Sequence, residues 1–265
     1  MAYSDFLQLA LMNLALIGAM MIVLWALSVA IRDSSIADIF WGFGLAITAW
    51  FTWWIDDGVP ARQQLVLTLI TLWALRIGIY IGWRNRGGED ARYAHLRRYV
   101  TERGKNYNLH SLVHIYLQQG FFMWLVSLVL IFAIASDTPT SLGTLAYVGT
   151  ALWCLGMFFE TVGDWQLSRF RVDPANAGRV MDRGLWRYTR HPNYFGEACV
   201  WVGFFAIAME NPAAIVTVIS PAMMLWVLMG PLGKGLLERR MSKKRPEFAE
   251  YARRTSGFFP LPPRR

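Results

Sequence analysis

Long apolar runs recur along this chain of 265 residues, and they limit its possible folds more than any other feature of the sequence. Each run holds about 20 mainly apolar residues, enough for a helix to cross the hydrocarbon core of a bilayer. Because lipid cannot bond to backbone N–H and C=O groups, such a run must satisfy them within a helix. We therefore predict an all-α, polytopic integral membrane protein, a single membrane domain over residues 1–265 with about seven spans, at roughly 6–30, 36–55, 64–83, 112–135, 142–163, 193–210 and 212–233.

The connections between these runs differ in charge. Lysine and arginine concentrate in the loops 84–111 and 164–192 and in the tail 234–265, whereas Arg62 is the only basic residue in an even-numbered connection. The positive-inside rule places the basic loops and the tail in the cytoplasm and the N-terminus outside. An odd number of spans agrees, because it puts the two ends on opposite sides. Within the tail, residues 239–251 have the pattern of an amphipathic helix that Pro246 interrupts.

Composition narrows the function. A net charge of +8 is typical of nucleic-acid binding, but here the basic residues punctuate apolar spans and form no continuous face, which argues against a nucleic-acid partner. Cys154 and Cys199 both fall inside predicted spans, where cysteine behaves as a small apolar residue. The 4 histidines are scattered along the chain, so we expect neither a disulfide framework nor a metal site.

The segment Gly184–Glu197 is the densest group of polar residues next to an apolar run. Pro192 suits the first turn of a helix, and a helix that begins there carries Asn193 and Glu197 on one stripe with Tyr194 beside them. Guanidinium groups next to a helix N-terminus suit a phosphate or another anion. The basic residues just before this helix are Arg187, Arg190 and His191. The alternative is a basic loop that anchors the next membrane helix.

Charged residues inside apolar spans need a partner or a function, because each costs about 2.5–3.5 kcal/mol on insertion scales. If the fifth span continues as a helix past 163, then Glu160, Asp164 and Arg171 share one of its faces. A structural salt bridge between Asp164 and Arg171 is one interpretation. The other is that this face forms one wall of a polar pocket for an anionic ligand.

Three further polar residues lie in the second and third spans. Arg76 and Tyr80 share a face of the third span, and Asp38 follows the start of the second. Asp38 is either an acid favoured by the helix dipole or a partner for Tyr80 or Arg76 that holds a proton donor. These polar residues come from the cytoplasmic ends of several spans, which predicts a polar cofactor site facing the cytoplasm and an apolar cavity for a lipidic substrate.

The stretch from Phe159 to Arg171, followed by Arg183 to Glu197, resembles the DUF1295 proteins of bacteria. That family is similar to the steroid 5-alpha-reductases and, more distantly, to the sterol reductases. The Arg-His-Pro-x-Tyr core at Arg190–Tyr194 also occurs in the isoprenylcysteine carboxyl methyltransferases, but the combination with Asp164, Arg171 and Glu197 looks more like the reductases. The resemblance implies a seven-helix enzyme in a bacterial inner membrane that binds NADPH from the cytoplasmic side.

The resemblance also implies cofactor contacts. By motif match they are Asn85, Arg86, Asp164, Arg171, Asn193 and Glu197. The tail positions Lys234 and Glu238 fall where the reductases have further cofactor contacts, although the residue types differ there. The physical reading of the motif adds Arg187, Arg190, His191 and Tyr194. The catalytic half departs from the family: where the steroid enzymes have a Gln-Glu pair this chain has Ala37-Asp38, and no tyrosine aligns with theirs in the third helix.

We therefore expect an NADPH-dependent oxidoreductase acting on CH–CH groups, which transfers hydride to the conjugated C=C bond of a lipophilic steroid-like or isoprenoid enone. Tyr80, oriented by Asp38 or Arg76, would donate a hydrogen bond to the substrate carbonyl. One alternative is an S-adenosylmethionine-dependent methyltransferase of the lipid or isoprenylcysteine type. Another is a membrane scaffold or transporter without enzymatic activity. The expected partners are the lipophilic substrate and membrane lipids.

Overall fold

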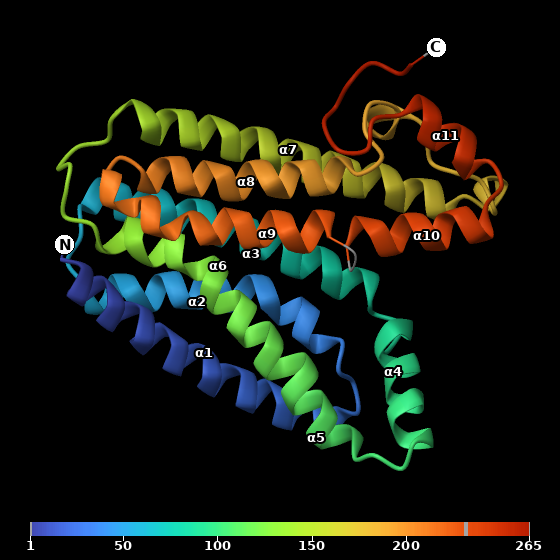
Figure 1. The fold of residues 1–265 in the computed structure, drawn as a ribbon, viewed down its shortest axis with the longest axis horizontal. Helices are drawn as coiled ribbons and strands as arrows, with labels where there is room; N and C mark the ends of the chain where they lie inside the picture. The colour runs from blue at the N-terminus through green and yellow to red at the C-terminus, as the bar shows by residue number, and fades with distance from the viewer. Residues whose placement is uncertain (1, 231–232, 265) are drawn as a thin grey trace. The chain divides into compact units, whose positions relative to one another are not determined.

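Helices account for nearly all of the chain's regular structure. A computed structural model describes residues 2–230 and 233–264, and within these residues there is no β-strand, only an isolated bridge between Thr189 and Ser256. The α-helices are α1 (Tyr3–Ile31), α2 (Ile36–Ile55), α3 (Pro60–Arg84), α4 (Ala91–Glu102), α5 (Tyr107–Ser111), α6 (Gln118–Ala135), α7 (Thr144–Val172), α8 (Pro192–Ala208), α9 (Ile219–Met229), α10 (Lys234–Lys244) and α11 (Phe248–Arg254) (Figure 1). A π-helix, η1 (Leu112–Leu117), joins α5 to α6, and short 3-10 helices form η2 (Pro174–Asn176), η3 (Gly184–Arg187) and η4 (Pro212–Val218).

Six helical segments among the described residues are long and apolar enough to cross a bilayer, which confirms the all-α membrane fold. They are Tyr3–Ile31, Ile36–Ile55, Pro60–Arg84, Tyr107–Ala135, Thr144–Val172 and Pro212–Met229. The predicted span 193–210 corresponds to α8, which has 17 residues. The predicted span 212–233 corresponds to η4 and α9, and its residues 231–232 lie outside the described part of the chain. The count of seven spans and the sidedness of the termini stay predictions.

The described residues fall into two compact units. Unit 1 lies within residues 1–143 and 208–217, and unit 2 lies within residues 144–207 and 218–265. In unit 1 the helices α1, α2, α3 and α6 pack around a core that includes Met21, Leu45, Ile70 and Met123. Apolar residues also point outward, and Trp54 is 76% exposed, as lipid contact requires. The single membrane domain predicted from the sequence stays a prediction.

Arg62, the only basic residue in an even-numbered connection, has a structural role at the end of α6. Its side chain is buried, and its guanidinium donates to the carbonyl oxygens of Ala133 at 3.0 Å and Pro139 at 3.2 Å, and to that of Ser136. The last carbonyls of a helix have no partner within it, so Arg62 completes the C-terminal end of α6.

Unit 2 is built on a close crossing of α7 and α8 (Figure 1). The glycines at the contact are spaced by seven residues on each helix, so they line one side of it. A Cβ atom at Gly196 would lie 2.5 Å from the carbonyl oxygen of Gly156, and one at Gly203 would lie 2.6 Å from that of Gly149. Small residues of this kind let membrane helices approach at the backbone level. At these glycines the backbones of the two helices therefore meet with no room for a larger side chain.

The loop between α7 and α8 is fixed to both α7 and the tail. Trp186 Nε1 donates to the carbonyl oxygen of Gly163 at 3.0 Å, and the Tyr251 hydroxyl donates to that of Trp186 at 2.6 Å. The tail then runs along the loop, where the N–H of Leu261 donates to the carbonyl oxygen of Tyr188 at 3.0 Å. As predicted, Pro246 separates two tail helices, α10 and α11.

Candidate functional site

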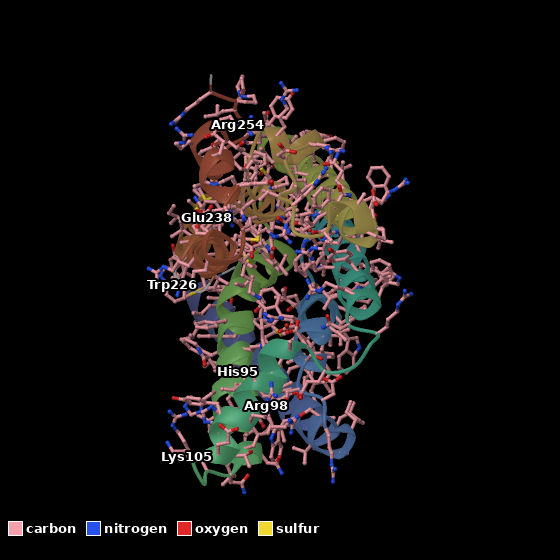
Figure 2. The ribbon with its side chains drawn as sticks, turned by 90° about the vertical axis from the view of Figure 1, so that its right-hand side faces the viewer. His95, Arg98, Lys105, Trp226, Glu238 and Arg254 are labelled. Carbon is pink, nitrogen blue, oxygen red and sulfur yellow. The ribbon has the colours of Figure 1, made fainter. Side chains whose placement is uncertain are left out.

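Glu238 on α10, labelled in Figure 2, bonds to two cationic or titratable side chains of unit 2 and is the centre of a charged cluster. Its Oε1 accepts hydrogen bonds from Arg190 Nε at 3.0 Å and from His191 Nε2 at 2.9 Å, and its Oε2 accepts one from Arg190 Nη2 at 3.3 Å. The Arg190 and His191 side chains are only 14% and 9% exposed, and exclusion of water strengthens such bonds. The fold thus joins three residues that the sequence predicts as cofactor ligands.

Arg190 is bonded on every side. Besides Glu238, its guanidinium donates through Nη1 to the carbonyl oxygens of Ala252 at 2.7 Å and Thr255 at 3.2 Å. Four of the five N–H donors of the group are therefore in use. This bonding gives Arg190 a positioning role, because it ties the α7–α8 loop to α10 and to the end of α11.

His191 completes the cluster on the side of α8. Its ring stacks on that of Tyr194, with centroids 5.2 Å apart and an interplanar angle of 14°. Burial lowers the pKa of His191, although its hydrogen bond with Glu238 acts in the opposite direction. The imidazole is therefore neutral at pH 7, and the carboxylate beside Nε2 indicates that this nitrogen carries the proton.

Lys234 supplies a second cation to the cluster. A Cβ atom at Gly257 would lie 2.6 Å from Lys234 Nζ and 3.0 Å from Arg190 Nη2, so both cationic groups face the same backbone position. Their charges also act on His191, since each lowers its pKa. Glycine at 257 leaves the room that these two side chains occupy.

Asp164 and Asn193 form a second polar pair, where α8 begins beside α7. Asn193 Nδ2 donates to Asp164 Oδ1 at 3.2 Å, and Asn193 Oδ1 accepts from the N–H of Tyr194 at 3.1 Å. Asp164 is buried, so this amide partner offsets part of its desolvation. The approach depends on Gly163, where a Cβ atom would lie 3.2 Å from the Pro192 ring.

The other predicted ligands of unit 2 lie farther along the chain. Glu197 is one turn into α8 and is partly buried, whereas Arg171 is exposed in the last turn of α7. Arg187 is exposed and lines a groove together with Arg183 and Arg254. Helix α7 does continue to Val172, as the predicted face of Glu160, Asp164 and Arg171 requires.

In unit 1, Asp38 lies in the first turn of α2 and joins a polar cluster of its own. Its carboxylate accepts hydrogen bonds from the Tyr93 hydroxyl at 2.7 Å and from Arg92 Nη2 at 2.7 Å. Gln119 Nε2 lies 3.4 Å from the same carboxylate and donates to the Tyr93 hydroxyl at 3.1 Å. Burial and the charge of Asp38 both raise the pKa of Tyr93, so the phenol keeps its proton at neutral pH.

The other two predicted catalytic residues lie on α3. The Arg76 guanidinium carbon is 5.5 Å from the centroid of the Tyr80 ring, and that of Arg84 is 6.0 Å from it. These distances are those of cation–π contacts. The structure therefore places Arg76 beside Tyr80, as predicted, and gives Asp38 the hydroxyl of Tyr93 as its partner.

Asn85 and Arg86 follow the end of α3. The N–H of Asn85 donates to the carbonyl oxygen of Ile81 at 2.9 Å, and its side-chain oxygen accepts from Arg84 Nε at 3.3 Å. Its Nδ2 is buried and has no hydrogen-bond partner among the described residues. Arg86 is exposed and lies over the Trp83 ring at 5.2 Å. A buried amide donor without a partner is uncommon, and it suits a ligand that brings an acceptor.

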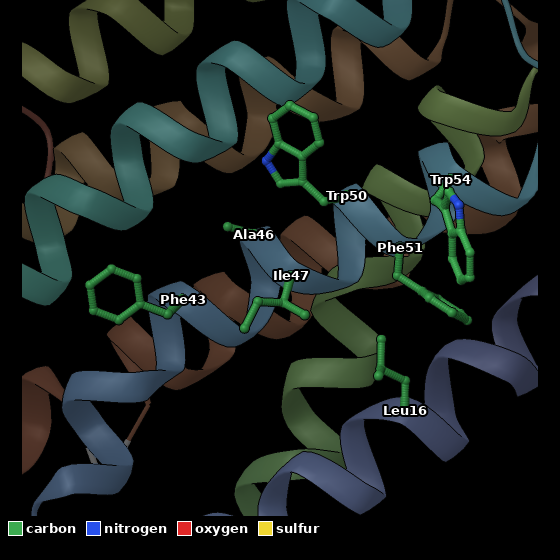
Figure 3. A pocket seen from close by; sticks show the side chains of 7 residues that line it. All are labelled: Leu16, Phe43, Ala46, Ile47, Trp50, Phe51 and Trp54. Carbon is green, nitrogen blue, oxygen red and sulfur yellow. The ribbon is translucent and has the colours of Figure 1, made fainter.

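An apolar groove of about 470 Å³ runs between α1 and α2 (Figure 3). Leu16 of α1 lies opposite Phe51 of α2, and the other lining residues, Phe43, Ala46, Ile47, Trp50 and Trp54, follow along α2. The lining carries no charged group, so the groove suits a lipid chain and offers no reactive side chain.

The sequence agrees with one family model over most of its length. Residues 24–255 match the family described as "Protein of unknown function (DUF1295)". This chain belongs to the DUF1295 family. A protein of Schizosaccharomyces pombe, "Uncharacterized protein C594.04c", is 24% identical to this chain in an alignment 268 residues long, gaps included, that covers 90% of this chain and 76% of the yeast protein. No solved structure matches the chain. The family predicted from the motifs is thus confirmed.

Three polar residues that contact Asp38 were not predicted as site residues from the sequence. They are Arg92, Tyr93 and Gln119. The one local signal is Asp90, whose side chain accepts from the N–H of Arg92 and caps α4, so that Tyr93 falls in the first turn of a helix. That signal says nothing about Asp38, which is 55 residues away in the chain. Among the described residues no three His, Cys, Asp or Glu side chains form a group that could hold a metal ion.

Because of the charged cluster around Glu238, we expect the folded state of this chain to lose stability in acid. The folded pKa of His191 lies below its ordinary value of 6.5, so between the two values the unfolded chain binds more protons. Although burial opposes it, the hydrogen bond from His191 and the charge of Arg190 lower the pKa of Glu238 below 4.5, which adds a loss of stability below that pH. We expect the thermal midpoint in detergent to fall as the pH drops from 7 to 5 and to fall further below 4.5.

His191→Gln separates the two effects. This variant is expected to flatten the pH dependence between 7 and 5, while His95→Gln, at an exposed histidine of α4, leaves it unchanged (Figure 2). A profile for His191→Gln that is parallel to the wild type over this range would contradict the assignment.

Proposed function

We propose that this chain is an NADPH-dependent membrane reductase that delivers hydride to the conjugated C=C bond of a lipophilic steroid-like or isoprenoid enone. The observation that carries the proposal is the arrangement at the start of α8. There the pair of the buried Asp164 and the partly buried Asn193 adjoins the His191–Tyr194 stack, and His191 is bonded to Glu238. Carboxylates, amides and cations in one place are the groups that a phosphorylated dinucleotide requires.

The residues of unit 2 fit the chemistry of such a cofactor. Asp164 and Glu197 offer acceptors for ribose hydroxyl groups, and Asn193 offers both an acceptor and a donor. Lys234 offers a cation for a phosphate, as does Arg171. Arg190 uses its donors to hold Glu238 and the tail, so its part in binding is to position the others. NADPH, when bound, would supply the hydride.

Unit 1 carries two further features that support a reductase. Asn85 Nδ2, buried without a hydrogen-bond partner among the described residues, is a donor that a phosphate oxygen would satisfy. The Tyr93 hydroxyl donates its one proton to Asp38 and accepts a hydrogen bond from Gln119. When that proton turns from Asp38 to a substrate, Tyr93 can donate a hydrogen bond to a carbonyl oxygen that gains negative charge. We therefore add Tyr93 to Tyr80 as a candidate proton donor, with Asp38 and Arg76 as their orienting groups.

Topology and surface chemistry complete the proposal. The positive-inside rule places the α7–α8 loop and the tail on the cytoplasmic side of a bacterial inner membrane, where NADPH is available. The apolar groove of unit 1, lined by Phe43, Ile47 and Trp50 among others, offers a lipophilic molecule a surface within the bilayer (Figure 3).

The test is cofactor binding and turnover by the full chain in detergent, with NADPH, NADH and S-adenosylmethionine as ligands and a panel of steroid and isoprenoid enones as substrates. We expect NADPH to bind most tightly and Asn193→Ala to weaken it about tenfold, the usual effect of losing one or two hydrogen bonds. Tyr93→Phe and Tyr80→Phe identify the donor, because removing it lowers kcat about 100-fold and leaves NADPH binding unchanged.

Asn176→Ala is the matched control, since Asn176 belongs to the same unit and, among the described residues, its side chain donates only to the nearby Phe170 carbonyl and the Asp173 carboxylate. Tighter binding of S-adenosylmethionine than of NADPH would point to a methyltransferase. The absence of binding by any of the three ligands would point to a scaffold or transporter. Equal NADPH affinity in the wild type and in Asn193→Ala would remove this site from the proposal.

A further inference from the structure

A second polar groove lies in unit 2, between the α7–α8 loop and the end of the chain. Its volume is about 770 Å³, and its walls are formed by Asp182, Arg183 and Arg187 from the loop, Arg254 from α11, and Arg264 from the tail. Four guanidinium groups thus line one groove that holds a single carboxylate. Like charges gathered in this way repel each other, and an anion between them removes the repulsion.

Most of these arginines are available for a ligand. Arg254 lies 4.0 Å from Asp182 and 3.5 Å from Glu250, which are loose, half-exposed pairs. In contrast, the side chains of Arg183, Arg187 and Arg264 make no hydrogen bond or ion pair within the described part of the chain. Arginine presents a planar fork of donors that binds two oxygens of a phosphate at once. Three such groups around one groove indicate a phosphate-bearing ligand.

The backbone of the groove is held in place without a ligand. Gly184 has a φ of +57°, which turns the chain between Arg183 and Leu185, and the N–H of Leu185 donates to Gln166 Oε1 at 3.0 Å. On the other wall, the N–H of Arg264 donates to the carbonyl oxygen of Arg254 at 2.9 Å. The groove is therefore preformed, so a ligand need not order these segments.

The surroundings of the groove indicate where the phosphate comes from. Helix α7 has 29 residues and a length of about 43 Å, whereas the hydrocarbon core of a bilayer is about 30 Å thick, so its end and the following loop lie at the membrane surface. Three apolar side chains of the same loop and tail are exposed there: Tyr188 at 43%, Phe259 at 63% and Leu261 at 51%. Aromatic and aliphatic side chains next to arginines are typical of the lipid headgroup region.

We propose that this groove binds the phosphate headgroup of an anionic phospholipid, with Tyr188, Phe259 and Leu261 inserted among the lipids beside it. The guanidinium groups neutralise the phosphate, and the apolar side chains hold the loop and tail against the bilayer. The proposal reassigns Arg187 from the cofactor to the lipid and does not depend on reductase activity.

The experiment uses the full chain in detergent, titrated with short-chain phosphatidylglycerol, with phosphatidylcholine of the same chain length and with inorganic phosphate, while native mass spectrometry counts the bound molecules. We expect phosphatidylglycerol to bind at least about tenfold more tightly than phosphatidylcholine. The double variant Arg183→Gln/Arg264→Gln is expected to lose about 30-fold in phosphatidylglycerol affinity, because each basic residue near an anionic lipid surface is worth about fivefold.

Two control variants separate the groove from general charge. Arg179→Gln/Lys243→Gln removes the same charge from exposed positions outside the groove, and we expect it to keep the wild-type affinity. Phe259→Ser/Leu261→Ser is expected to weaken phosphatidylglycerol and leave inorganic phosphate unchanged. The thermal midpoint of each variant shows whether it is folded.

Several results would overturn the proposal. One is equal affinity for the two lipids, and another is wild-type phosphatidylglycerol affinity in Arg183→Gln/Arg264→Gln. If inorganic phosphate binds as tightly as the lipid, the groove is a site for a soluble anion. If the groove variant loses NADPH and keeps phosphatidylglycerol, the groove belongs to the nucleotide. The effect of Asn193→Ala on NADPH binding, by contrast, bears only on the proposed reductase, because Asn193 does not line this groove.

Discussion

Replacing Gly196 with leucine is expected to destabilise the fold by more than about 3 kcal/mol, the upper end of the usual cost of overpacking. A Cβ atom at this position would lie 2.5 Å from the carbonyl oxygen of Gly156 and 2.7 Å from the backbone nitrogen of Glu160. Both are backbone atoms of α7, so no side chain can move aside. The two helices would have to separate, and the Asp164–Asn193 pair at their crossing would separate with them. Thermal unfolding in detergent, with size-exclusion chromatography, measures the loss.

Gly18→Leu is the matched control for this prediction. Gly18 lies on α1, and apart from its own helix backbone and chain neighbours no described atom lies within 4 Å of the position that its Cβ would take. Because glycine weakens a helix interior, this change should be neutral or stabilising by up to about 1 kcal/mol. A thermal midpoint of Gly196→Leu equal to that of the wild type would mean that α7 and α8 do not meet at these glycines.

The second large effect is expected for Arg190→Ala, which should destabilise unit 2 by about 3–5 kcal/mol. This is the usual cost of removing one partner of a largely buried ion pair. The variant leaves the Glu238 carboxylate, itself only 23% exposed, without the guanidinium that bonds to it. It also leaves the carbonyl oxygens of Ala252 and Thr255 without the donors that Arg190 provides. The expected result is a lower thermal midpoint and faster proteolysis of the tail that contains α11.

Two comparisons show whether the charge pair is the cause. Arg190→Met/Glu238→Met removes both charges and should be less destabilised than Arg190→Ala, because no uncompensated carboxylate remains. Arg179→Ala, at an exposed arginine of the same loop, should change the stability by no more than about 0.5 kcal/mol. If Arg190→Ala unfolds at the same temperature as Arg179→Ala, the Glu238 cluster does not hold the tail.

Much of the fold was predictable from local patterns. The second span, predicted at 36–55, coincides with α2, and the predicted end of the fourth span at 135 is the end of α6. Hydropathy succeeds here because lipid allows only internally bonded helices. For the fifth span it gave an end at 163, because polarity marks where a helix leaves the bilayer, whereas α7 continues as a helix to Val172. The helix α4, in the loop after α3, is polar for the same reason and gave no hydropathy signal.

The candidate site was only partly predictable. The motif around Pro192 correctly indicated where α8 begins, and it named Asn193, His191 and Tyr194 as neighbours at that point. It could not indicate that Glu238 bonds to Arg190, 48 residues away, because a single sequence carries no signal for pairing between distant segments. The same limit hid Tyr93, which lies beside Asp38, and the groove between the α7–α8 loop and the tail.

The sequence by itself determined that this protein is a helical membrane protein of the DUF1295 family and which of its segments are apolar. Both follow from local composition and motifs, since the bilayer selects helices by length and polarity alone. Only the tertiary structure decided that α7 and α8 meet through glycines, that Glu238 joins Arg190 and His191, and that Asp38 holds Tyr93. These contacts depend on which side chains the packed helices bring within bonding distance, and helix packing is a property of the whole fold.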